Sequence, residues 1–341
     1  MFGTKKVRVG INGFGRIGRA LFRLSLEDKD VEIVAVNDLG DAANLAYLLK
    51  YDTVYRTLDA EVKAENGSLV VNGKKISFIS EKEPTKIPWK DLGVDVVVES
   101  TGVFDTYEKA SAHLSAGAKR VVISAPVKED AADGATVLMG VNEEKLSSCK
   151  VSSNASCTTN ATSPVIAILD EKLGIEKALL NTTHSYTATQ SIVDGPVKGA
   201  DFRRGRAAAQ NMSPSSTGAA VAVTKAYTQL QGKFDGIAVR VPTPAGSIAD
   251  ITFVAKRDTT AEEVNQILTE AAKSARWQGI FTVSEEQLVS SDIIGNTHAS
   301  IADLALTRVV GGNLVKVMAW YDNEMGYTNT LLRHVKKAGQ A

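Results

Sequence analysis

The chain has 341 residues, 44% of them hydrophobic, and this length exceeds what one hydrophobic core usually serves, so we expect two domains. Its 39 lysines and arginines balance 39 aspartates and glutamates, which excludes an overall field that would attract nucleic acid or an anionic membrane. No stretch approaches the roughly 18 apolar residues of a membrane span, and residues 1–10 lack the apolar core of a signal peptide, so a cytoplasmic protein is expected.

Short β-branched segments alternate with helical ones in the first part of the chain. Strands are predicted at residues 6–11, 31–38, 94–101 and 119–126. Helical spacing of apolar residues is found at residues 16–26 and 106–118. This alternation is typical of a parallel, doubly wound sheet, and it predicts an α/β domain of the Rossmann type over residues 1–156.

The pattern changes after about Cys157. Longer alternating segments at residues 236–244 and 249–258 predict a mainly antiparallel sheet, and a capped amphipathic helix is predicted to begin near Thr260. Residues 157–323 are therefore expected to form an α+β domain. A last helix, within residues 324–341, is expected to pack back on the first domain.

Gly13, Gly15 and Gly18 form a GxGxxG motif between the first predicted strand and helix. Glycines at this spacing permit a tight turn, let the backbone approach a pyrophosphate at the helix N-terminus, and let helix and strand pack closely. The motif alone is also compatible with a simple turn. Asp38, twenty residues further on, favours NAD because a carboxylate there binds ribose hydroxyls and repels a 2′-phosphate. The alternative is that Asp38 caps a helix or a turn.

Two cysteines, Cys149 and Cys157, are too few for a disulfide framework. Cys157 follows a turn of small residues and precedes the helical segment 158–173. A thiol at a helix N-terminus gains thiolate character from the helix dipole and the free N–H groups, so Cys157 is a candidate nucleophile. The alternative for Cys157 is a buried packing role, and Cys149 is interpreted as a buried strand thiol.

A nucleophilic thiol needs an adjacent base, and the chain contains four histidines. The helix over residues 158–173 rises about 24 Å, and a strand returning from Glu176 recovers this height in about seven or eight residues, at His184. Pro164 weakens the estimate, because an interior proline should kink or restart the helix. His184 is the predicted base, with a hydrogen-bonded core histidine as the alternative.

Several residues are candidates for holding anions. Arg240 interrupts an otherwise apolar strand and is either part of an ion pair at the edge of the core or a phosphate ligand. Thr217 and Gly218 precede a predicted helix and form either an anion cradle or a plain helix cap. A further cluster consists of three arginines, Arg203, Arg204 and Arg206.

The chain contains, in this order, the segments INGFGRIGR, SNASCTTN, HSYTATQ, RRGRAAAQN, PSSTGAA, RVPTP and WYDNEMGY. With them it closely resembles the phosphorylating glyceraldehyde-3-phosphate dehydrogenases, from Val7 to Val335. The resemblance implies oxidation of glyceraldehyde 3-phosphate by NAD, in which Cys157 attacks the aldehyde and His184 takes the proton. Inorganic phosphate then cleaves the thioester to give 1,3-bisphosphoglycerate. A homotetramer without a metal is implied, with residues 157–323 as the catalytic domain.

The resemblance also implies the ligands of each group. The cofactor residues are Asn12, Gly13, Gly15, Arg16, Ile17, Gly18, Asp38, Lys82, Ser124 and, for the nicotinamide carboxamide, Asn323. One phosphate is assigned to Ser156, Thr158, Thr217 and Gly218, and the other to Thr187 and Arg240. The backbone N–H of Cys157 is expected to hold the oxyanion.

The chain departs from many family members at three places. Ala161 stands where a second cysteine is common, Lys82 stands where arginine is commoner, and residues 193–206 differ in length and sequence. The alternative activity is that of an erythrose-4-phosphate dehydrogenase. Aspartate-semialdehyde dehydrogenase is a more distant alternative, and a catalytically silent NAD-binding protein belongs to a different class.

Overall fold

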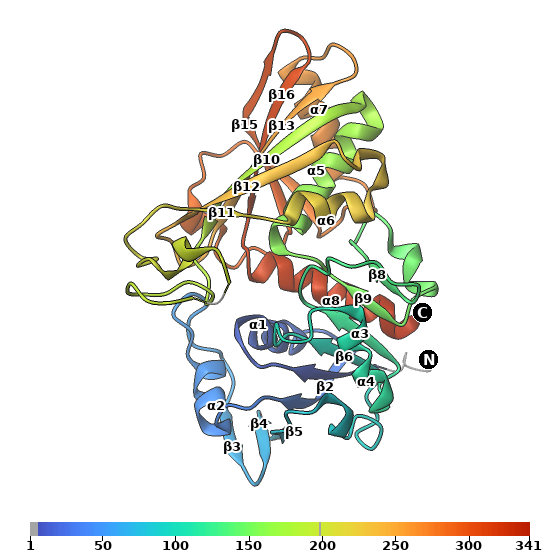
Figure 1. Ribbon diagram of the computed structural model, residues 1–341, viewed down its shortest axis with the longest axis vertical. Helices are drawn as coiled ribbons and strands as arrows, with labels where there is room; N and C mark the ends of the chain where they lie inside the picture. The colour runs from blue at the N-terminus through green and yellow to red at the C-terminus, as the bar shows by residue number, and fades with distance from the viewer. Residues whose placement is uncertain (1–5, 198) are drawn as a thin grey trace. The chain divides into compact units, whose positions relative to one another are not determined.

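The computed structural model describes residues 6–197 and 199–341. Residues 1–5 of the predicted first domain, and Lys198 of the segment 193–206, lie outside the described residues. The described chain divides into two compact units (Figure 1). Unit 1 consists of residues 6–137, 143–155 and 328–341, and unit 2 of residues 138–142, 156–197 and 199–327. No helix in the described part of the chain is long and apolar enough to cross a membrane.

Unit 1 contains a nine-stranded sheet in the order β3-β4-β5-β2-β1-β6-β7-β9-β8. The strands are β1 (Val7–Asn12), β2 (Val31–Asn37), β3 (Val62–Glu65), β4 (Ser68–Val71), β5 (Lys74–Ile79), β6 (Val96–Glu99), β7 (Arg120–Ile123), β8 (Gly134–Thr136) and β9 (Val151–Ser153). All neighbours are parallel except β3–β4 and β4–β5. The predicted doubly wound parallel sheet is therefore confirmed. Because β2 and β6 flank β1 on opposite sides, the topological switch point lies at β1, where such sheets bind nucleotides.

The helices of unit 1 are α1 (Arg16–Ser25), α2 (Ala42–Lys50), α3 (Tyr107–Ala110) and α4 (Ala112–Ser115). The single helix predicted over residues 106–118 is wrong, because the segment forms two short helices that break at Ser111. The Ser111 hydroxyl donates a 2.6 Å hydrogen bond to the Glu108 carbonyl, a local bond of the kind that competes with the helical ladder.

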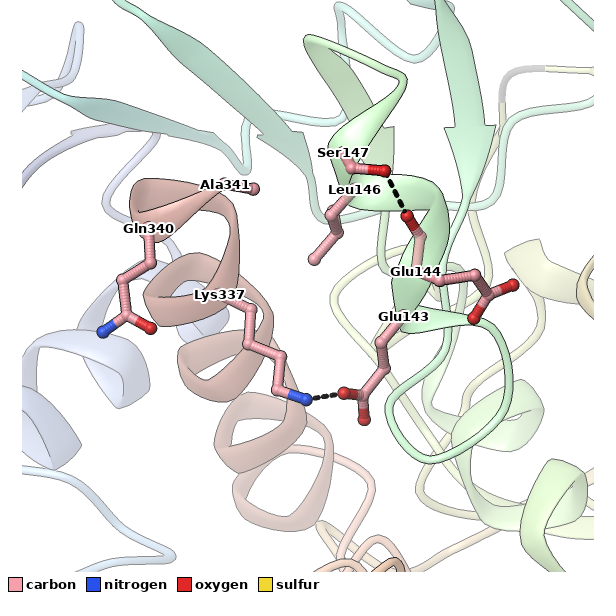
Figure 2. Close-up of a pocket in the computed structure, with 7 residues that line it drawn as sticks. All are labelled: Glu143, Glu144, Leu146, Ser147, Lys337, Gln340 and Ala341. Atoms are coloured by element: carbon pink, nitrogen blue, oxygen red, sulfur yellow. Dashed lines mark hydrogen bonds and ion pairs between the residues drawn. The ribbon is translucent and has the colours of Figure 1, made fainter.

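Helix α8 (Met325–Gln340) contributes most of its length to unit 1. Lys336 Nζ lies 2.9 Å from the Asp28 carboxylate, near the start of the chain. A surface pocket of about 450 Å³ lies at the end of this helix. Lys337 forms an ion pair with Glu143 there (Figure 2). None of the candidate site residues lines this pocket. The two lysines therefore serve to fix α8 within unit 1.

The antiparallel edge β3–β4–β5 was not predicted, although the sequence contains a signal for it. Asn-Gly pairs occur at residues 66–67 and 72–73, and all four residues have positive φ, from 50° to 77°. This conformation is the one that tight hairpin turns require, and Asn-Gly adopts it at low cost.

Unit 2 contains a seven-stranded sheet in the order β11-β12-β10-β13-β16-β15-β14. The strands are β10 (Ile175–Ser185), β11 (Ser213–Ser216), β12 (Phe234–Val241), β13 (Ser247–Ala255), β14 (Phe281–Ser284), β15 (Ser300–Val310) and β16 (Leu314–Tyr321). The pairs β10–β12 and β14–β15 are parallel and the other pairs are antiparallel. This sheet confirms the predicted mainly antiparallel α+β architecture.

Three helices of unit 2 pack on its sheet, namely α5 (Cys157–Leu173), α6 (Ala219–Ala226) and α7 (Ala261–Ala272) (Figure 1). Thr260 caps α7 as predicted, because its hydroxyl accepts a 3.2 Å hydrogen bond from Glu263 N. Pro164 lies inside α5, and the helix does not restart there. Short 3₁₀ helices lie at Pro84–Lys86, Glu143–Ser147, Phe202–Gly205, Thr228–Leu230 and Ser290–Ile293.

Candidate active site

Cys157 is the first residue of α5, as the sequence pattern indicated. The preceding Ser156 has extended backbone, and its hydroxyl accepts a 3.1 Å hydrogen bond from Thr159 N. This cap begins the helix directly at the cysteine. The backbone N–H groups of Cys157 and Thr158 hydrogen-bond the thiol, so the free donors of the helix end are directed at the sulfur.

His184 is the penultimate residue of β10, and its Nε2 lies 3.3 Å from Cys157 Sγ. The other ring nitrogen, Nδ1, lies 2.6 Å from the Ser185 carbonyl oxygen. Because a carbonyl can only accept, Nδ1 carries the proton, and the lone pair of Nε2 faces the sulfur. The structure thus brings together a thiol and an imidazole oriented to take its proton.

The electrostatics of this pair differ from the sequence-based expectation. We expected the helix terminus to give Cys157 thiolate character, but burial raises the pKa of its thiol and outweighs the N–H groups and the charge of Arg240. Burial, and then the positive charge of Arg240, lower the pKa of His184 to about 4. An adjacent neutral base is therefore needed at the moment of attack, as the sequence indicated.

Arg240 lies on β12 directly beside His184 in the parallel register. Its Nη1 donates to Thr187 Oγ1 at 3.3 Å, while its buried Nε has no hydrogen-bond partner among the described residues. Burial, and then the charge of Arg204, lower the pKa of Arg240. No carboxylate in the described part of the chain forms an ion pair with Arg240, which argues against the ion-pair alternative. A half-buried cation beside a second cation, with a buried donor left over, is suited to binding an anion.

A second cluster of donors lies where α5 and α6 begin. Thr159 Oγ1 donates to the Ala219 carbonyl at 3.3 Å and lies 2.7 Å from Ser156 Oγ, so the two helix starts are adjacent. Gly218 is the N-cap of α6, and the Thr217 hydroxyl accepts a 3.2 Å hydrogen bond from Ala219 N. Backbone N–H groups and hydroxyls concentrated in this way form a site suited to an anion.

In unit 1 the three glycines of the motif have different surroundings. Gly13 has φ +95°, and a Cβ there would lie 2.7 Å from the Ser100 carbonyl carbon. A Cβ on Gly18 would lie 2.3 Å from the Gly13 oxygen, whereas one on Gly15, at the start of α1, would meet nothing within 4 Å. Gly13 thus provides the tight turn, Gly18 the close packing of α1, and Gly15 the open approach to the backbone. All three features suit the binding of a pyrophosphate.

Asp38 directly follows β2 and supports the same turn. Its Oδ2 accepts a 2.6 Å hydrogen bond from Phe14 N, and its Oδ1 accepts one of 2.8 Å from Gly40 N. The carboxylate is therefore also a turn residue, in agreement with the alternative interpretation, and it lies beside the glycine turn where a ribose carboxylate is needed. The two roles are compatible.

Two other predicted cofactor residues have their side chains engaged inside unit 1. Asn12 Nδ2 donates to Glu99 Oε2 at 2.5 Å, and Arg16 Nη1 lies 2.5 Å from Asp52 Oδ2. Their backbones border the glycine turn, and each side chain already has a polar partner inside unit 1. Asn12 and Arg16 therefore shape this edge of the sheet.

The remaining candidates lie at separate places. Ile17 is the second residue of α1, Lys82 is exposed after β5, and Ser124 follows β7 at the carboxyl edge of the sheet. In unit 2, the Asn323 side-chain oxygen accepts from Gly246 N at 3.2 Å, which orients its amide nitrogen as a donor. No group of metal-ligating side chains occurs in the described residues.

Comparison with known proteins identifies the family. A model described as "Glyceraldehyde 3-phosphate dehydrogenase, NAD binding domain" matches residues 7–107, and one described as the C-terminal domain of the same enzyme matches residues 156–323. The chain belongs to the glyceraldehyde-3-phosphate dehydrogenase family. It is 51% identical over 328 residues to glyceraldehyde-3-phosphate dehydrogenase 1 of Bacillus subtilis, with 96% of each chain covered. It is 50% identical over 329 residues to the enzyme of Streptomyces coelicolor, again with 96% of each chain covered.

NAD is accordingly the cofactor of this member of the glyceraldehyde-3-phosphate dehydrogenase family. The range matched by the NAD-binding model contains the glycine turn and Asp38, whose geometry fits a dinucleotide. The range matched by the C-terminal model begins at the helix cap Ser156 and contains the thiol–imidazole pair and Arg240.

Tyr321 is a site residue that the sequence did not indicate. Its hydroxyl lies 2.9 Å from Thr158 Oγ1 and 2.7 Å from Thr182 Oγ1, and its ring meets that of His184 edge-on at 6.0 Å. Burial raises the pKa of Tyr321, so the hydroxyl stays protonated. Tyr321 thus supports the imidazole and joins α5 to β10. The sequence contains one signal for it, because alternate side chains of β16 face inward and Tyr321 belongs to the inward set.

Proposed function

We propose that this protein is a phosphorylating glyceraldehyde-3-phosphate dehydrogenase, which converts glyceraldehyde 3-phosphate, NAD and inorganic phosphate into 1,3-bisphosphoglycerate and NADH. The observation that carries the proposal is the 3.3 Å approach of His184 Nε2 to Cys157 Sγ, beside an Arg240 whose buried Nε has no hydrogen-bond partner among the described residues. The curated relatives named for this activity support the choice over erythrose-4-phosphate dehydrogenase.

The proposed reaction begins at the sulfur. Cys157 Sγ forms a bond to the aldehyde carbon while His184 Nε2 takes the thiol proton, and the carbonyl oxygen becomes an oxyanion held by the Cys157 N–H. Bound NAD supplies the acceptor for the hydride of that carbon. A phosphate oxygen then attacks the resulting thioester, the carbon–sulfur bond breaks, and the acyl phosphate leaves. His184 holds the proton that the departing sulfur needs.

Two phosphate groups must be held during this reaction. We assign one to Arg240 and Thr187, where the Nε of the half-buried guanidinium has no hydrogen-bond partner among the described residues. The other is assigned to the donors at the starts of α5 and α6, which are Ser156, Thr158, Thr217 and Gly218. Phosphate on Arg240 neutralises the charge that lowers the pKa of His184, so substrate binding makes the imidazole a better proton acceptor.

The test of this proposal is phosphate dependence. With glyceraldehyde 3-phosphate and NAD, sustained NADH formation should require inorganic phosphate, and an acyl phosphate should appear in equal amount, measured as its hydroxamate. A carboxylic acid formed without phosphate consumption would indicate a hydrolytic aldehyde dehydrogenase instead. A kcat/KM higher with erythrose 4-phosphate than with glyceraldehyde 3-phosphate would overturn the substrate assignment.

The cofactor is proposed to bind at the carboxyl edge of the unit 1 sheet. Its pyrophosphate is assigned to the glycine turn and the start of α1, and its adenosine ribose to Asp38. The remaining proposed contacts are Asn12, Arg16, Ile17, Lys82, Ser124 and Asn323. The backbones of Asn12 and Arg16 border the glycine turn, while Asn12 Nδ2 donates to Glu99 and Arg16 Nη1 pairs with Asp52.

Replacing Asp38 with serine should raise the ratio of kcat/KM for NADP to that for NAD by about tenfold or more, because the repulsion of the 2′-phosphate is removed. The affinity for NAD should also fall, because Phe14 N loses a charged acceptor. Steady-state kinetics with both nucleotides measure the ratio. The matched control is Asp41→Asn, which removes a nearby exposed charge and should leave it unchanged. An unchanged ratio in the serine variant would place the selectivity elsewhere.

A homotetramer is proposed from the resemblance. Support comes from the face of the unit 2 sheet opposite its helices, where exposed and half-buried apolar side chains gather: Leu179, Ile237, Ile248, Val254, Met318 and Trp320. The same face carries the Asp250–Lys316 ion pair, and exposed apolar side chains among polar ones are typical of subunit interfaces. We further propose residues 1–156 with the helix in 324–341 as the NAD-binding domain, residues 157–323 as the catalytic domain, and a cytoplasmic location.

A further inference from the structure

A row of buried polar side chains crosses the centre of the unit 1 sheet at its carboxyl edge. Asn37, Asn12 and Glu99 end β2, β1 and β6, and the parallel register makes them lateral neighbours. Each is less than 5% exposed. Asn37 Nδ2 donates to Asn12 Oδ1 at 2.7 Å, and Asn12 Nδ2 donates to Glu99 Oε2 at 2.5 Å. The row therefore ends in a carboxylate.

Glu99 accepts hydrogen bonds from four donors. Oε1 accepts from the backbone N–H of Thr101 at 2.8 Å and from its hydroxyl at 2.5 Å. Oε2 accepts from Asn12 and lies 3.0 Å from His113 Nε2. Four donors match an acceptor-only carboxylate and leave no place for a carboxyl proton. The side chain is thus held rigidly in its charged form.

The imidazole of His113 supplies no positive charge to this group. Trp89 Nε1, which can only donate, lies 3.0 Å from His113 Nδ1, so Nδ1 is an acceptor and the proton is on Nε2, facing Glu99. His113 and Trp89 are both completely buried. No lysine or arginine of the described residues forms an ion pair with Glu99. The carboxylate is therefore a fixed, buried negative charge without a counter-cation.

The position of this charge relates it to the cofactor. Asp38 assigns the adenosine half of NAD to the β2 side of the switch point, and the glycine turn after β1 holds the pyrophosphate. The nicotinamide half then extends over the carboxyl ends of β6 and β7, and Glu99 ends β6. The nicotinamide ring is a cation in NAD⁺ and neutral in NADH.

We propose that Glu99 is a specificity-determining residue that favours the oxidised cofactor over the reduced one. The inference rests on the proposed NAD-dependent oxidation. The fixed carboxylate attracts the cationic ring, whereas it acts equally on the pyrophosphate of both forms. Asn12, His113 and Trp89 are positioning residues that hold the charge in place.

The test compares dissociation constants of NAD⁺ and NADH, measured by calorimetry at low salt on the full chain. Glu99→Gln keeps the shape and removes the charge, so it should weaken the binding of NAD⁺ about tenfold more than that of NADH, because a charge–charge attraction is lost from the oxidised form alone. A loss that is equal for both forms, or greater for NADH, would overturn the proposal.

Two controls separate charge from disturbance of the network. Thr101→Val removes one donor from the carboxylate and keeps its charge, so it should weaken both nucleotides equally. Glu108→Gln removes an exposed charge on α3 and should change neither affinity. The double variant Asn12→Asp/Glu99→Gln returns a carboxylate to the row and should restore the preference, which also provides a test if the single variant does not fold.

These measurements need no turnover. Wild-type protein that binds NAD⁺ but forms no acyl phosphate would contradict the proposed function and leave the inference standing. Normal turnover by the wild-type protein, together with equal losses of affinity for NAD⁺ and NADH in Glu99→Gln, would support the proposed function and contradict the inference.

Discussion

Replacing Cys157 with serine is expected to lower kcat for aldehyde oxidation by at least about 10⁴-fold. A serine hydroxyl has a far higher pKa than a thiol and is a poorer nucleophile and leaving group, and His184 with its lowered pKa is too weak a base to compensate. NADH formation from glyceraldehyde 3-phosphate at saturating phosphate measures the effect. A stopped-flow experiment should also lack the rapid first turnover that an acyl-enzyme produces.

The Cys157→Ser variant should bind NAD with nearly wild-type affinity, because the proposed cofactor turn lies in unit 1. Cys149→Ser is the matched control. Cys149 is buried, burial raises the pKa of its thiol, and its backbone carbonyl, not its sulfur, accepts from Arg120. This control should keep full activity. Retained turnover in the Cys157 variant would exclude a covalent mechanism.

The parts of the site that the sequence predicted depend on local pattern and element length. The glycine spacing places a turn between β1 and α1, and the lengths of α5 and β10 return the chain to the level of Cys157 at His184. Those lengths follow from residues adjacent in sequence. The predicted proximity of His184 to Cys157 is confirmed although Pro164 lies within α5, because the helix continues through this proline.

The parts that were missed depend on strand order. Glu99 and Asn12 are 87 residues apart in sequence, and Tyr321 and Thr182 are 139 apart. Their contacts exist because β6 pairs with β1, and because β16 and β10 both flank β13. A single sequence indicates that a residue faces inward, but not which strand will lie beside it.

The ionisation of the thiol could not be predicted for a related reason. Helix position and N–H donors are visible in the sequence, and both favour a thiolate. The opposing effect is desolvation, which depends on how densely residues from several elements surround Cys157 and His184 in three dimensions. In this protein burial dominates both groups.

Replacing His184 with asparagine should lower kcat/KM for glyceraldehyde 3-phosphate by about 10³-fold, the size of effect typical for loss of a general base. The thiol then has no acceptor for its proton, and alkylation of Cys157 by iodoacetamide at pH 7 should slow as well. His298→Asn is the control, because it removes a half-buried imidazole of unit 2 that does not contact the thiol. It should leave both rates unchanged.

The pH profile distinguishes loss of a base from a merely altered fold. In the wild-type protein the pKa of His184 is lowered to about 4, so the imidazole is unprotonated throughout the neutral range and the acid limb of kcat/KM should lie below the ordinary histidine value of about 6.5. In the asparagine variant the thiol must ionise unaided. Because burial raises its pKa, the residual rate should keep rising beyond about pH 9. A variant profile that is parallel to that of the wild type at every pH would mean that His184 supports the site without taking the proton.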